Sequence, residues 1–377
     1  MSERERQSNF ELMRIISMIF IVLYHILIHG QIIEHATGAT EVFLIFIESI
    51  LLVHVNSFVL LSGYFQCESK LKAGKVIQLN NMVWFYKVVI MIVLIWLGII
   101  VKPDLMTRIH TYFPIDYGTY WFIGSYLVLY IISPILNKII NHSNQKELKR
   151  TIVVLFLIIS IASTFSLDIF FNTKTGRSLS TFILLYFIGA YCKKYSIDNS
   201  YFMKPFTQRA KTCLYFLIFI IFALISTFCW IGYCHLNPLG NIASELGSII
   251  GTAHISYASP IVIIETVGYF LFFATLNFKN KWINKIASCT FAVYLISENI
   301  YIREILYDYL GITKVKIITI SYILQMIALA IIIFIICIII ELIRKRIFKI
   351  IYNTKTAEKN RKWYRNFIKE LGITINW

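Results

Sequence analysis

The chain has 377 residues, of which 58% are hydrophobic and only 15% are charged. This composition excludes an ordinary soluble domain, because apolar runs of about 20 residues recur from one end of the chain to the other. The formal net charge of +16 does not indicate a nucleic-acid-binding protein. Most Lys and Arg residues lie between the apolar runs, where they set membrane orientation and meet anionic lipid headgroups.

The apolar runs predict an all-α, polytopic membrane protein with about ten transmembrane helices. The alternating pattern of a membrane β-barrel is absent, and in lipid only helices or closed barrels satisfy the backbone. The predicted spans are Leu12–Gly30, Val42–Phe65, Met82–Val101, Tyr120–Ile140, Ile152–Phe171, Leu179–Cys192, Thr212–Tyr233, Tyr257–Leu276, Ile286–Leu306 and Ile317–Ile343.

The loops predict the orientation of these spans. One set of alternate loops, together with the C-terminal tail, is richer in Lys and Arg than the other set. The positive-inside rule therefore places both termini in the cytoplasm, with the protein as a multi-pass component of the cell membrane. We expect a membrane-embedded domain over residues 1–343 and a basic cytoplasmic tail over residues 344–377. The tail can lie on anionic lipid or remain solvated.

Three ionisable residues interrupt the first predicted span. His25 follows Arg14 by eleven residues and His29 lies one turn beyond His25. Eleven residues are about three helical turns, so all three side chains share one face, with Arg14 and His25 about 16 Å apart along the axis. Ionisable residues inside a span are costly and by default mark a functional site. The alternative is an arginine that snorkels to the interface and a histidine that packs between helices.

Other predicted spans also carry ionisable residues. Glu48 and His54 lie in the second span and Glu298 in the ninth. A carboxylate buried in lipid must be paired or protonated. The candidate partners for Glu48 and Glu298 are Arg14, Lys87 and Arg303. A metal site built from His25, His29, His54 and His254 is conceivable, but only the His25–His29 spacing supports one, so no metal is expected.

Several short motifs occur in a fixed order along the chain. They are Arg14 and His25 with ten residues between them, Phe58-Val-Leu-Leu-Ser-Gly-Tyr-Phe65, Tyr120-Trp-Phe-Ile-Gly124 with Tyr130-Ile-Ile-Ser-Pro134, Tyr186-Phe-Ile-Gly-Ala-Tyr191, and Phe291-Ala-Val-Tyr-Leu-Ile296. In this order the motifs resemble the acyltransferase 3 family of bacterial integral-membrane O-acyltransferases, which modify surface polysaccharides. The resemblance covers roughly residues 10–343.

Two positions depart from the family pattern. Lys70, Lys72 and Lys75 stand where many members have an arginine-rich stretch, so acyl-CoA would be held here by lysine point charges without the bidentate arginine fork. Glu298 stands where many members have a histidine, which changes any role of that residue.

The resemblance implies transfer of an acyl group, most often acetyl, from acyl-CoA to a hydroxyl of a cell-surface or lipid-linked glycan. A neutral, buried His25 suits a general base or an acyl carrier, and Arg14 suits a phosphate or thioester oxygen. Glu48, His54, Tyr120, Trp121 and Glu298 are the expected substrate-binding residues. The alternative from another class is a transporter or flippase for a lipid-linked polysaccharide, since midplane charges fit that function equally well. A purely structural scaffold is disfavoured by the buried charges.

Overall fold

A computed structural model describes residues 6–112, 120–165, 175–195, 203–236, 249, 251, 254–309 and 319–352. All regular structure in these residues is helical, as the composition predicted. The helices are α1 (Ser8–His29), α2 (Ala39–Leu51), α3 (Val53–Gln66), α4 (Ala73–Trp96), α5 (Leu105–Tyr112), α6 (Trp121–His142), α7 (Gln145–Leu155), the π-helix η1 (Phe156–Ile161), α8 (Ala162–Thr164), α9 (Leu179–Lys194), α10 (Gln208–Leu236), α12 (Pro260–Thr275), α13 (Lys281–Ala287), α14 (Thr290–Ser297), α15 (Ile300–Tyr309) and α16 (Ile320–Tyr352).

Within the described ranges, six segments are long and apolar enough to cross a membrane. They are Ser8–His29, Ala39–Gln66, Gly74–Trp96, Trp121–His142, Gln208–Leu236 and Ile320–Ile350. Two further predicted spans are occupied by the shorter helices α9 and α12, each of 16 residues. The fifth predicted span is described only as far as residue 165. The chain is therefore a multi-pass membrane protein.

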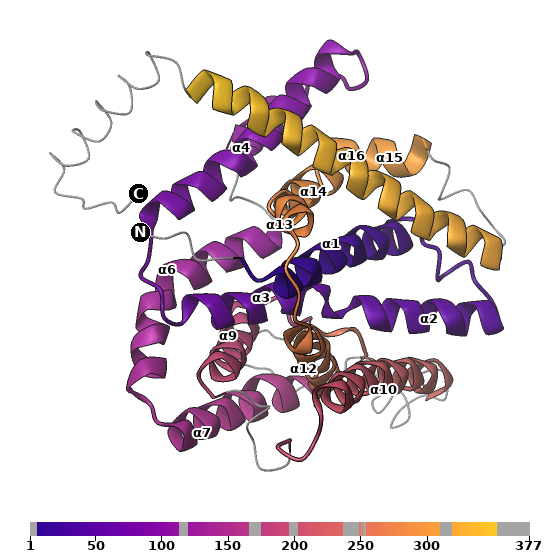
Figure 1. Cartoon of the computed structure of the whole chain (residues 1–377). Helices are drawn as coiled ribbons and strands as arrows, with labels where there is room; N and C mark the ends of the chain where they lie inside the picture. Colours follow the sequence, from indigo (N-terminus) through magenta and orange to yellow (C-terminus); the bar gives the residue numbers. More distant parts are fainter. Residues whose placement is uncertain are drawn as a thin grey trace, which may run out of the picture.

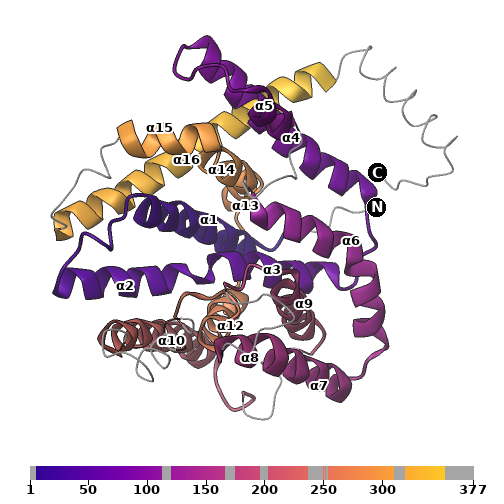
Figure 2. The same ribbon diagram turned by 180° about the vertical axis from the view of Figure 1, so that it is seen from behind.

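Helix α1 lies at the centre of the bundle (Figures 1 and 2). It packs against α2 and α3 on one side and against α13, α14 and α16 on another. Phe10, Met13 and Ile26 are buried along its length. Because α1 packs against helices from distant parts of the chain, its side chains can meet partners far away in the sequence.

The segment predicted as the ninth span is broken into three short helices. Helix α13 ends at Ala287, α14 begins at Thr290 and ends at Ser297, and α15 begins at Ile300. The polar pair Glu298-Asn299 forms the second break. The Asn299 side chain accepts a hydrogen bond from the backbone N–H of Tyr301 at 3.0 Å, which competes with helix continuation and starts α15. The expectation of one continuous helix over Ile286–Leu306 is wrong for this reason, and the break places Glu298 at the C-terminal end of α14.

Two glycines from the sequence motifs set the closest helix contact. Gly63 on α3 and Gly189 on α9 face each other's backbones. An added Cβ at Gly63 would lie 2.1 Å from the carbonyl oxygen of Tyr186, and one at Gly189 would lie 2.2 Å from that of Leu60. Small residues of this kind let membrane helices approach closely. These two motif glycines therefore hold α3 against α9.

We expect Gly63→Ala or Gly189→Ala to lower the stability of the fold, because the new methyl group meets backbone that cannot move aside. Overpacking of this kind costs about 1–3 kcal/mol. The thermal midpoint of the detergent-solubilised protein measures the effect. Gly124→Ala in α6 is the matched control, since its Cβ would meet nothing within 4 Å. Equal midpoints for all three variants would contradict the role of the α3–α9 contact.

Candidate active site

His25, His29 and Glu298 form a cluster, which we call the His25 cluster. The His25 Nδ1 atom lies 3.1 Å from Glu298 Oε1, and the His29 Nε2 atom lies 3.7 Å from Glu298 Oε2. The two imidazole rings are stacked with centroids 5.7 Å apart. Helix α1 supplies both histidines from one face, and the α14–α15 break supplies the carboxylate. Glu298 is buried, whereas the histidine side chains are partly exposed.

His54 lies close to this cluster on α3. Its Nδ1 atom is bonded to the carbonyl oxygen of Leu51, which can only accept, so Nδ1 carries the proton. Its Nε2 atom therefore accepts from the Tyr257 hydroxyl at 3.2 Å. The Tyr24 ring, next to His25 on α1, lies 4.9 Å from the His54 ring. His54 is thus held as a neutral, fully bonded imidazole beside the cluster.

Aromatic side chains continue from His54. The ring of Trp121, at the start of α6, stacks on Tyr257 with centroids 5.9 Å apart, and the Arg177 guanidinium lies 5.4 Å from the Trp121 ring centroid. Arg177 and Arg303 both lie close enough for their positive charges to interact with the His25 imidazole. In the described part of the chain, Arg177 has no carboxylate partner. The surroundings of His25 therefore combine stacked rings with positive charge.

Tyr120 has a positioning role in the structure. Its buried hydroxyl donates to the carbonyl oxygen of Leu295, at 2.7 Å, in the last turn of α14. Asn299 donates to the same hydroxyl at 3.5 Å. Tyr120 thereby connects α6 to both sides of Glu298 and fixes where that carboxylate lies.

Glu48 belongs to a separate buried group. Its Oε2 atom lies 3.6 Å from His254 Nε2, and His254 Nδ1 lies 2.9 Å from the Ser226 hydroxyl. Helix α2 supplies Glu48 and α10 supplies Ser226. The hypothesis that Glu48 is paired with Arg14, Lys87 or Arg303 is wrong, because the carboxylate meets a histidine from the segment before α12.

Arg14 lies at the opposite end of α1 and is paired locally. Its Nη1 atom lies 2.6 Å from the Oε1 atom of Glu11, one turn earlier, and its guanidinium lies 5.5 Å from the Phe65 ring centroid. We call Glu11, Arg14 and Phe65 the Arg14 end. The hypothesis that Glu298 or Glu48 is the partner of Arg14 is wrong, because Glu11 occupies that place on the same helix. Arg14 and His25 therefore belong to two sites.

Basic residues gather around the Arg14 end. Lys70, Lys72 and Lys75 are exposed before and within the first turns of α4, and the charges of Lys72 and Arg14 act on Lys75. The Lys193 ammonium lies 5.0 Å from the Tyr64 ring centroid, next to Phe65. The structure thus places the lysines on the Arg14 side of the molecule, away from the His25 cluster.

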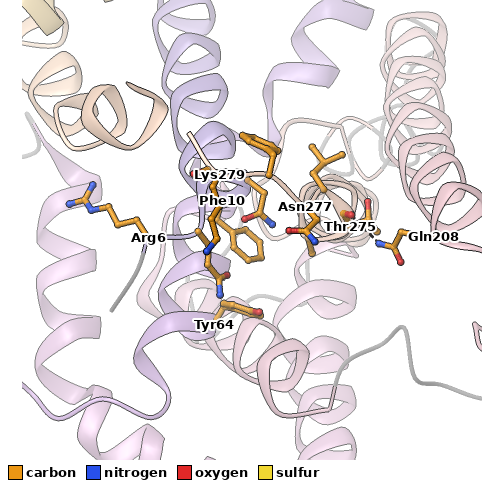
Figure 3. Close-up of a pocket in the computed structure, with 13 residues that line it drawn as sticks. Arg6, Phe10, Tyr64, Gln208, Thr275, Asn277 and Lys279 are labelled. Atoms are coloured by element: carbon orange, nitrogen blue, oxygen red, sulfur yellow. Dashed lines mark hydrogen bonds between the residues drawn. The ribbon is translucent and has the colours of Figure 1, made fainter. Parts of the chain in front are cut away.

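A pocket of about 660 Å³ opens beside the Arg14 end (Figure 3). Phe10 lines the pocket, and its ring lies 5.5 Å from the Phe65 ring, over which the Arg14 guanidinium lies. Polar groups dominate its wall, and its labelled lining residues are Arg6, Phe10, Tyr64, Gln208, Thr275, Asn277 and Lys279. A pocket with two cations and several amides suits an anionic, hydrogen-bonding ligand.

Cys67, at the C-terminal end of α3, is a nucleophile to consider on this side of the molecule. Burial raises the pKa of the Cys67 thiol to about 11. The thiol therefore stays protonated at neutral pH, and only the thiolate is a strong nucleophile. We therefore interpret Cys67 as a packing residue. The sequence also contains no CxxC pair.

The comparison with family models decides the class of protein. A model described as an acyltransferase domain, that of the acyltransferase 3 family, matches residues 7–342. The chain belongs to the acyltransferase 3 family. It is therefore a membrane acyltransferase. The searches of curated proteins and of solved structures found no significant match.

Several residues of this candidate site were missed in the sequence. Glu11 was overlooked because it precedes the apolar run, although an acid three residues before Arg14 is a helical ion-pair signal. Tyr257 and Arg177 gave no signal, since a tyrosine and a loop arginine are common in membrane proteins. Their place beside His25 depends on the packing of α12 and α9 against α3.

We expect Glu298→Gln to reduce acyl transfer by this family member by about 10²–10⁴-fold. The amide cannot stabilise a protonated His25, and its NH₂ group favours the wrong imidazole tautomer. The measurement is the initial rate of acyl transfer at matched protein amount. Glu34→Gln changes an exposed carboxylate in the loop after α1 and should retain the wild-type rate. Equal rates for both variants would remove Glu298 from the site.

Proposed function

We propose that this acyltransferase transfers a short acyl group, with acetyl as the group we assign, from acyl-CoA to a hydroxyl of a cell-surface or lipid-linked glycan. The observation that carries the proposal is the 3.1 Å approach of Glu298 Oε1 to His25 Nδ1 in a chain of this family. A carboxylate behind one imidazole nitrogen leaves the other free to act as a base.

The chemistry assigned to His25 is proton transfer. Its Nε2 atom accepts the proton of the glycan hydroxyl while the hydroxyl oxygen attacks the thioester carbonyl carbon. A C–O bond forms, the C–S bond breaks, and the CoA thiolate leaves with the proton that the imidazolium returns. Glu298 orients the ring and stabilises its positive charge during this exchange. In the alternative two-step route, Nε2 carries the acyl group before the hydroxyl attacks.

The donor is assigned to the Arg14 end. Arg14, Lys70, Lys72 and Lys75 supply positive charge for CoA phosphates, and the pocket beside Phe10 offers Arg6 and Lys279 for the same purpose. Arg14 and His25 are about 16 Å apart along α1, which suits an elongated donor that reaches from one site toward the other. No metal cofactor enters this scheme.

The acceptor is assigned to the His25 side. Trp121 and Tyr257 offer stacked aromatic faces, on which sugar rings pack, and His54 adds a polar edge. Glu48, which contacts His254, is assigned to the same acceptor side. Tyr120 acts by holding the α14 terminus, and Arg177 supplies a guanidinium beside Trp121.

The proposed topology follows from the loop charges. Ten spans with both termini in the cytoplasm place the Arg14 end toward cytoplasmic acyl-CoA and the His25 cluster toward the outer half of the plasma membrane. The basic tail after residue 343, where α16 continues to Tyr352, then faces anionic lipid on the cytoplasmic side. The remaining tail lies outside the described residues.

The test follows labelled acetyl from acetyl-CoA into glycan or lipid-linked glycan in membranes that hold matched amounts of wild type or His25→Ala. We expect the label to fall by about 100-fold or more, because the general base is lost. His142→Ala is the control, since this exposed histidine is bonded only to its own helix at Lys138.

Two outcomes would contradict the proposal in different ways. Full transfer by His25→Ala would remove the base while leaving an acyltransferase. No transfer from any short acyl-CoA, with glycan export still dependent on the protein, would favour the transporter.

A further inference from the structure

The three donor atoms of the His25 cluster converge as metal ligands do. One imidazole nitrogen from each of His25 and His29 and one Glu298 carboxylate oxygen lie within 4.8 Å of one another. His29 follows His25 by one helical turn, so the backbone of α1 holds both imidazoles on one face. Glu298 reaches the pair from the α14–α15 break, with contacts of 3.1 and 3.7 Å.

Two of these atoms are also buried without a hydrogen bond. Within the described residues, neither His25 Nδ1 nor Glu298 Oε1 has a hydrogen-bond partner, although Glu298 is only 5% exposed. Buried polar atoms in native proteins almost always have a partner, and an exception needs an explanation, of which a bound ion is one. Both unpartnered atoms belong to the same cluster and lie beside each other.

We propose that His25, His29 and Glu298 form a binding site for a divalent transition-metal ion, with Zn²⁺ as the best fit. Two imidazole nitrogens and one carboxylate oxygen are a typical zinc donor set. Zn–N and Zn–O bonds of about 2.0–2.2 Å place tetrahedral donors about 3.3–3.5 Å apart, close to the two observed contacts. The histidine side chains are partly exposed, which gives an ion a route to the cluster from outside.

The ion would inhibit acyl transfer, and this consequence rests on the proposed function. A metal bound to His25 Nδ1 requires the lone pair of that atom, so the imidazole proton moves to Nε2. Nε2 is the atom that must accept the proton of the hydroxyl. Bound zinc therefore prevents His25 from acting as the general base. Glu298, as a metal ligand, also no longer orients the His25 ring or stabilises its positive charge.

Binding is tested on the full chain purified in detergent, with ZnSO₄ titrated against a chromogenic zinc indicator. We expect one ion per wild-type chain. In His29→Ala the affinity should fall by about 10- to 100-fold or more, since a direct ligand is lost. His142→Ala should bind as the wild type does. Glu298→Gln provides a second variant, and size-exclusion elution confirms that each variant is folded.

Co²⁺ gives a readout that is independent of activity. Its visible absorption reports nitrogen and oxygen ligands in a low-coordinate site, and the band should be present in wild type and His142→Ala but absent in His29→Ala. Unchanged zinc affinity and an unchanged cobalt spectrum in folded His29→Ala and Glu298→Gln would overturn the proposal, as would the absence of zinc binding by the wild type.

The inhibition is measured as the zinc concentration that halves acetyl transfer, normalised to each variant's own rate. We expect this concentration to rise in His29→Ala by the same factor as the dissociation constant. Wild-type transfer that is insensitive to saturating zinc would overturn the inhibitory role. A protein that binds zinc as expected but never transfers acetyl would instead refute the proposed function, since binding is scored without turnover.

Discussion

Charged groups in the interior of this protein must find partners, and this constraint connects its helices. A carboxylate removed from water loses hydration that only a close, well-placed partner offsets. Glu298 meets His25 and His29, Glu48 meets His254, and Glu11 meets Arg14. Glu341 on α16 accepts from Tyr86 on α4 and from Arg344. Apart from the pairs within α1 and α16, each contact joins segments far apart in the sequence.

Glu265 is the informative exception. It is fully buried in α12, and both of its carboxylate oxygens lack a hydrogen-bond partner among the described residues. A charge cannot be kept there, so this carboxyl group is neutral. The contrast shows that the presence of an acid in a span does not by itself indicate a charged, paired group.

The sequence was enough for the features that depend on one helix. The periodicity of α1 placed Arg14 at one end and His25 with His29 at the other, because helical geometry fixes positions eleven and four residues apart. The pairing of His25 with Glu298 could not be predicted from the sequence. Glu298 lies on a distant segment, and its position depends on the break between α14 and α15. The run Ser297-Glu298-Asn299 was a signal for that break, because polar residues that bond to their own backbone favour helix ends. The hydropathy of the flanking residues concealed it.

The two sites are related through shared helices. Helix α1 carries Arg14 and His25, and α3 carries Phe65 at one end and His54 near the other. The close contact of Gly63 and Gly189 holds α3, which carries both Phe65 and His54, against α9. The distance between the two sites is thus a property of the scaffold rather than of mobile loops.

The broken segment α13–α15 also has a consequence for how the chain is made. Short helices with unpaired backbone ends cannot face lipid, because hydrocarbon offers no hydrogen bonds. The Leu295 carbonyl is satisfied by Tyr120 from α6, and the last turn of α14 packs near α4 and α16. During synthesis, this segment leaves the ribosome before α16 exists to cover it. The packing of this segment against α16 can therefore form only after α16 has been made.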